Sequence, residues 1–170
     1  MRDQIWKNFQ NSIFKSFILD EMIKVYQERE RWTNVILAFA SSGSVATWAI
    51  WDKVPLLWGG IIAASNVIMV IKPHFPYSKY LKEIREKKIY ALTINLEFEK
   101  LWYKVQYDKL NEDEVVEEFF LIRENLNKAF NFNEEISLQD KQSIQENAAI
   151  KTKIYFDINY NVIINILDNE

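Results

Sequence analysis

The apolar side chains near the start of the chain recur at the three- and four-residue spacing of an amphipathic helix. No proline or glycine interrupts residues 4–31. The apolar positions of this segment are Ile5, Phe9, Ile13, Phe17, Met22, Val25 and Tyr26. The pattern predicts an N-terminal amphipathic helix as a first domain, residues 1–31. Such a helix can lie on a membrane surface or dock against later helices, and its near-neutral charge favours docking.

Two uncharged runs follow this helix, residues 33–51 and residues 54–71, with only Asp52 and Lys53 between them. At about 1.5 Å per residue, each run approaches the roughly 30 Å of a hydrocarbon core. Tryptophans lie near the ends of the runs, and lysines and arginines flank the pair. We therefore expect a transmembrane hairpin over residues 32–72, with both termini cytoplasmic, in a bacterial inner membrane. The alternative is a soluble helical bundle with a buried hairpin.

Polar and small residues in the first run share one helix face, which lipid cannot satisfy. One interpretation is helix packing, because small residues let two backbones approach closely. The other is a water-lined pore formed by several copies around an axis. The candidate pore-lining residues are Asn34, Ala38, Ser41, Ser44, Val45 and Trp48.

Residues 73–170 predict a cytoplasmic helical domain. No helix breaker occurs in residues 78–110, whose apolar positions resemble a coiled-coil seam interrupted at Lys88 and Asn95. Those apolar positions are Leu81, Ile84, Ala91, Phe98, Trp102 and Val105. The fold class predicted is therefore an all-α membrane protein: a two-helix transmembrane hairpin with an N-terminal amphipathic helix and long C-terminal cytoplasmic helices.

Two more helices are expected within this domain. Asn111 with Glu114 matches a capping box, which predicts a helix from Glu112 with Val116, Phe119, Leu126 and Phe130 facing inward. Ser137 with Asp140 would cap a further helix from Leu138, bearing Ile144, Ala148, Tyr155 and Ile158. Residues 154–167 are rich in β-branched side chains and asparagine, so a terminal strand would suit them nearly as well as a helix.

Composition narrows the chemistry. The 170 residues include no cysteine and one histidine, His74, which excludes thiolate chemistry and most transition-metal and Ser-His sites. No phosphate loop, zinc helix or nucleophile elbow is found. We expect no enzymatic activity, catalytic residue, metal or cofactor. The net charge of −3 hides a segregation, because residues 72–109 are net basic and residues 111–140 strongly acidic.

The basic stretch at residues 79–90 has three interpretations. Anionic lipid headgroups could orient it, the acidic region at residues 112–140 could pair with it, or it could bind an anionic ligand whose bases stack on tyrosines. Copies around a symmetry axis would deepen the basic surface. The candidate ligand-binding residues are Tyr80, Lys82, Arg85, Lys87, Lys88 and Tyr90.

The order of these segments carries a family resemblance. A leader that ends in RERW at residues 29–32, a two-span hairpin with a minimal loop, and PHFPYSKYLKEIREKK at residues 73–88 precede a long helical tail. This layout resembles the SLATT group of bacterial two-transmembrane effectors. The resemblance implies a pore-forming effector of anti-phage defence, controlled by the nucleotide or oligonucleotide product of a partner nucleotidyltransferase.

Together these expectations describe a homo-oligomeric channel. We expect the channel to be a tetramer embedded in the lipid bilayer. A nucleotide or single-stranded oligonucleotide is expected to gate it. The alternative function is a non-conducting membrane anchor or scaffold that recruits a soluble partner through its cytoplasmic helices. Under that alternative, Ser41 and Ser44 only pack against neighbouring helices.

Overall fold

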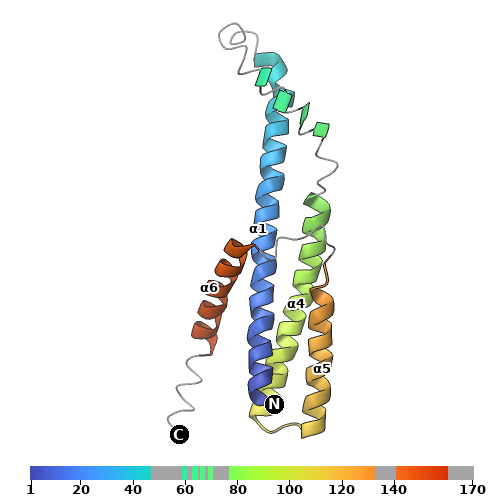
Figure 1. The fold of residues 1–170 in the computed structure, drawn as a ribbon, viewed down its shortest axis with the longest axis vertical. Coiled ribbons are helices and arrows are strands. Elements are labelled where there is room, and N and C mark those ends of the chain that lie inside the picture. Colours follow the sequence, from blue (N-terminus) through green and yellow to red (C-terminus); the bar gives the residue numbers. More distant parts are fainter. Residues whose placement is uncertain are drawn as a thin grey trace. The chain divides into compact units, whose positions relative to one another are not determined.

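A computed structural model gives the fold of the chain. It describes residues 1–46, 59–60, 63–64, 66–67, 69–70, 77–132 and 141–160, and only the backbone of residues 39–46. The helices named in Figure 1 are α1 (Arg2–Ala46), α4 (Tyr77–Gln106), α5 (Glu112–Ala129) and α6 (Gln142–Asn159). The regular secondary structure of the described residues is entirely helical, and they contain no strand.

One finding shows that the predicted fold class is wrong in calling the chain a membrane protein. Among the described helices, none is both long enough and apolar enough to cross a bilayer. The prediction counted residues without charge, but an uncharged run is not necessarily apolar, and asparagine, serine and threonine dilute residues 33–51. The described part of that run continues α1 to Ala46. Residues 47–58 and most of the second predicted span lie outside the described residues.

The chain divides into two compact units. Unit 1 comprises Met1–Ile23 and Glu83–Glu170, and unit 2 comprises Lys24–Lys82. The predicted domain limits near residues 31 and 72 stay a prediction. In unit 2, the Tyr26 ring lies 6.1 Å from the ring of Tyr77 and 5.8 Å from that of Tyr80. Ser78 Oγ donates a hydrogen bond of 2.5 Å to Glu30 Oε1. These contacts join α1 to the start of α4.

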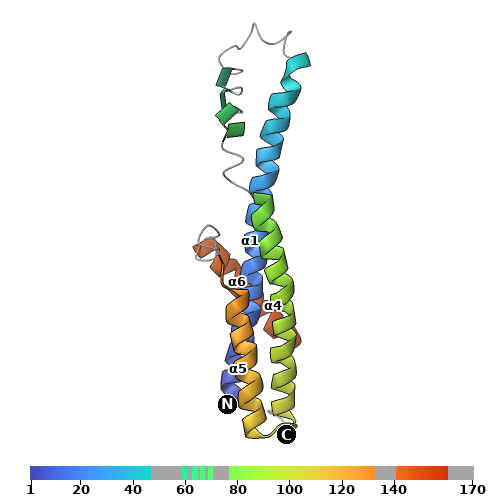
Figure 2. The same cartoon turned by 90° about the vertical axis from the view of Figure 1, so that its right-hand side faces the viewer.

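Unit 1 is a helical bundle around one apolar core. Figures 1 and 2 show α4 and α5 side by side, with the first half of α1 along α4. Ring contacts place α6 against α1: Trp6 lies 5.2 Å from Phe156, and Phe17 lies 6.3 Å from Tyr155. The core side chains contributed by α1 and α4 are Ile5, Phe9, Ile13, Ile94, Phe98, Leu101 and Trp102. Burial confirms most predicted apolar positions of these two helices, and the exceptions, which are only partly buried, are Phe17, Val25 and Val105.

The start of α5 confirms the predicted capping box. Asn111 Oδ1 accepts from the Glu114 backbone N–H at 2.9 Å, and Glu114 Oε2 accepts from the Asn111 N–H at 3.0 Å. Phe119 and Leu126 face inward as predicted, but Val115 is buried in place of Val116. The buried positions of α5 follow alternating spacings of four and three residues from Val115 to Ala129. Val115 lies four residues before Phe119 and belongs to this row, whereas Val116 does not.

The last described helix, α6, begins at Gln142 after the N-cap residue Lys141. The cap predicted at Ser137 and Asp140 lies outside the described residues. Ile144 and Ala148 are buried as expected, whereas Ile158 is exposed and Phe156 is buried instead. Residues 154–159 are helical. The prediction for residues 161–167 lies outside the described residues.

Candidate functional site

The two polar residues that interrupt the predicted apolar seam of α4, Asn95 and Lys88, both have polar partners on α1. Asn95 is buried against Ser12 and Ser16 of α1. With its amide oriented so that both atoms find partners, Asn95 Oδ1 accepts from Ser16 Oγ at 2.8 Å. Its Nδ2 then donates to Ser12 Oγ at 2.9 Å and to the Ala91 carbonyl at 3.2 Å. Because each buried polar atom is satisfied, this cluster fixes the register of α4 on α1.

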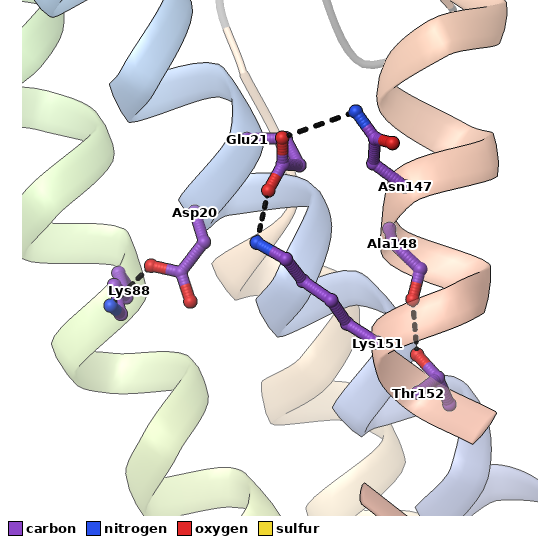
Figure 3. Close-up of polar contacts among 7 residues, drawn as sticks. All are labelled: Asp20, Glu21, Lys88, Asn147, Ala148, Lys151 and Thr152. Atoms are coloured by element: carbon purple, nitrogen blue, oxygen red, sulfur yellow. Dashed lines mark hydrogen bonds and ion pairs between the residues drawn. The ribbon is translucent and has the colours of Figure 1, made fainter. Parts of the chain in front are cut away.

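The second interruption, Lys88, forms an ion pair with Asp20 of α1. The next residue, Glu21, pairs with Lys151 of α6 and accepts a 3.5 Å hydrogen bond from Asn147 Nδ2. Figure 3 shows these two carboxylates pointing to different helices. Successive helix positions differ by about 100° in direction, so adjacent acidic residues can hold α4 and α6 at once.

The predicted ligand-binding residues are divided between the two units. Tyr80 and Lys82 belong to unit 2, and Tyr80 packs on Tyr26. Lys87 donates to the Asn131 carbonyl and lies 4.6 Å from the centre of the Phe132 ring.

The remaining candidate residues of that set differ in their surroundings. Lys88 is engaged by Asp20, whereas Arg85 and Tyr90 are exposed. The structure therefore uses two of the predicted cations to hold its own fold.

The predicted pore-lining residues all fall on or beyond the later part of α1. Asn34 and Ala38 are exposed in the single chain. Ser41, Ser44 and Val45 lie in α1, where only the backbone is described, and Trp48 lies outside the described residues.

A groove of about 550 Å³ lies between α1 and α6. Its aromatic lining includes Trp6, Phe14, Phe156 and Tyr160, and its polar lining includes Gln10, Asn11, Lys153 and Asp157. Tyr160 Oη donates to Glu99 Oε1 at 2.6 Å. Burial first, and this hydrogen bond second, raise the pKa of Tyr160 above its ordinary value. No group of three or more histidine, aspartate or glutamate side chains in the described ranges could hold a metal ion.

Opposite its core face, α4 presents a second apolar stripe to solvent. Ile89, Leu92 and Leu96 are 67%, 50% and 51% exposed. Their three- and four-residue spacing places them on one face, away from Ala91, Ile94 and Phe98. We call Ile89, Leu92 and Leu96 the α4 outer stripe. The sequence analysis predicts only one apolar face for this helix. The three- and four-residue spacing of the α4 outer stripe is the signal in the sequence that indicates the second face.

Searches for a matching family model, a curated relative and a solved structure each find none. The resemblance to the SLATT group therefore stays a prediction. The fold and the surface of the described residues define the chain only as a helical bundle with an exposed α4 outer stripe.

Proposed function

We propose that the chain is a self-assembling helical scaffold whose α4 outer stripe docks against a second copy. One observation carries the proposal: Ile89, Leu92 and Leu96 form a continuous exposed row at coiled-coil spacing. Single exposed aliphatic residues are ordinary on protein surfaces, but a contiguous row typically marks an interface. The opposite face of α4 already packs in the core of unit 1.

The strength of one such contact is limited. Covering a half-exposed aliphatic side chain contributes about 1 kcal/mol, so the stripe contributes about 3 kcal/mol. Association costs about 4 kcal/mol or more in lost translational and rotational freedom. Flanking contacts, or several contacts in a closed oligomer, are therefore needed for stable assembly. This favours an oligomer in which each copy makes more than one contact.

Four expectations from the sequence are not part of this proposal and stay predictions: the anti-phage role, the nucleotide-type ligand, the partner nucleotidyltransferase and the tetrameric state. Exposed Arg85 supports an anionic ligand, since several copies would add their charges around one axis. Pore formation is not part of the proposal, because it required the membrane hairpin.

Sedimentation velocity of the purified chain tests the scaffold proposal. Wild type is expected to sediment as an oligomer, and the double variant Leu92→Glu/Leu96→Glu as a monomer with an unchanged circular dichroism spectrum. Ile150→Glu/Ile154→Glu is the comparison variant, because Ile150, Ile154 and Ile158 form a second exposed aliphatic row, on α6. Loss of assembly in this variant alone would place the contact on α6 and contradict the proposal. A wild-type monomer across the accessible concentration range, or an outer-stripe variant with wild-type size, would contradict the proposal.

A further inference from the structure

We infer that the surface that receives the α4 outer stripe is the outward face of α5 in the next copy. The inference rests on the proposed function, and it names the partner surface. The contact would then be heterologous: each copy presents α4 to one neighbour and α5 to another.

The outward face of α5 combines apolar and acidic side chains. Val116 and Phe120 are exposed and lie one turn apart, next to buried Phe119, whose ring lies 5.5 Å from that of Phe120. Glu117 and Glu124 are exposed along one edge of this pair, two turns apart. Phe120 is 55% exposed, which is unusual for a phenylalanine in a helix that has its own core face.

The two surfaces are complementary in charge. Arg85 lies one turn before Ile89, and Lys100 lies one turn after Leu96, so exposed cations bracket the α4 outer stripe. The acidic edge of α5 offers Glu117 and also Glu124, which pairs with Lys128 one turn later in its own helix. The same complementarity operates inside one copy, where Lys104 of α4 pairs with Glu118 of α5 at 2.7 Å.

The two surfaces differ in length. Arg85 and Lys100 are separated by about 22 Å along α4, and Glu117 and Glu124 by about 10 Å along α5, so the long side chains of both cations must extend along the helix toward the carboxylates. An α4–α4 contact would bring the cations of two copies together, which opposes pairing. A contact between α4 and α5 joins opposite charges around an apolar centre. Because the two surfaces differ, repetition of the contact gives a closed ring or an open filament.

Charge reversal tests the inference in the full chain. The α4 variant is Arg85→Glu/Lys100→Glu, and the α5 variant is Glu117→Lys/Glu124→Lys. Each variant should weaken assembly about tenfold or more, because like charges then face each other. A chain that carries all four substitutions, and an equimolar mixture of the two variants, should regain the wild-type sedimentation coefficient. Recovery also shows that the variants fold.

The outcomes separate this inference from the proposed function. If Leu92→Glu/Leu96→Glu is monomeric while the α5 variant keeps wild-type size, the scaffold proposal stands and α5 is not the partner surface. If both charge variants are monomeric but neither combination restores assembly, the α4–α5 pairing is overturned. If the outer-stripe variant itself keeps wild-type size, both proposals fall.

Discussion

Glu21 of α1 forms an ion pair with Lys151 of α6, 130 positions later in the chain (Figure 3). Glu21 is 7% exposed, so this carboxylate anchors α6 from inside the bundle. Its neighbour Asp20 pairs with Lys88 of α4. Two successive side chains of α1 thus bind two helices that belong to distant parts of the sequence.

The anchor should contribute to the stability of unit 1. Replacing Glu21 with alanine removes the ion pair with Lys151 and the hydrogen bond from Asn147. Because Lys151 keeps partial access to water, we expect a loss of about 1–3 kcal/mol in the free energy of unfolding. Urea denaturation followed by circular dichroism measures this loss. The control is Glu146→Ala, which removes the exposed hydrogen bond from Gln142 and should leave the midpoint unchanged. Equal effects of the two substitutions would show that Glu21 is no special anchor.

The buried amide of Asn95 should also contribute to stability, through its serine partners. Asn95→Ala leaves the hydroxyls of Ser12 and Ser16 without this partner and opens a small cavity. We expect a loss of about 1–3 kcal/mol in the free energy of unfolding. Ser16→Ala/Asn95→Leu replaces polar by apolar groups on both sides, so it should recover part of that loss. A double variant that is less stable than Asn95→Ala would contradict this account.

The seam of α4 shows what local pattern could and could not predict. Leu81, Ile84 and Phe98 were predicted inward from spacing and are buried, because a helix with one apolar face must bury it. The partners of Lys88 and Asn95 could not be predicted, since Asp20 and Ser16 lie on another helix and only tertiary packing brings them close. Pairing with residues 112–140 was one of the three interpretations of the basic stretch, but Lys87 binds the Asn131 carbonyl rather than an acidic side chain, and Lys88 pairs with Asp20 of α1.

Two further cases show the same limit. Val115 and Val116 are identical side chains at adjacent positions, so composition gives no reason to choose between them. Packing of α5 on the core selects Val115. In residues 33–51, the absence of charge predicts a preference for lipid, but the hydroxyl and amide groups in that run reduce its hydropathy.

Tyr160 predicts how the fold responds to alkaline pH. Burial and the bond to Glu99 raise the pKa of Tyr160 in the folded state, and burial also raises the pKa of the adjacent Tyr155. A raised folded pKa favours the neutral hydroxyl, so this stability is fully present below the unfolded value of about 10 and is lost as pH rises above it. Between about pH 8 and about pH 11, wild type should therefore lose more unfolding free energy than Tyr160→Phe. Urea denaturation at the two pH values gives the difference. Parallel losses in the two proteins would exclude Tyr160 as the source.

The capping box of α5 gives the last prediction, which concerns local helix stability. Asn111→Ala removes the side-chain acceptor of the Glu114 N–H and should cost about 1 kcal/mol in the free energy of unfolding. The matched control is Asn127→Ala, an exposed position within the same helix, where alanine has the higher helix propensity and stability should stay equal or rise. Thermal and urea denaturation of both variants measure the contrast. If Asn111→Ala matches wild type while Asn127→Ala destabilises, the start of α5 does not depend on its cap, and packing of Val115 and Phe119 alone must set it.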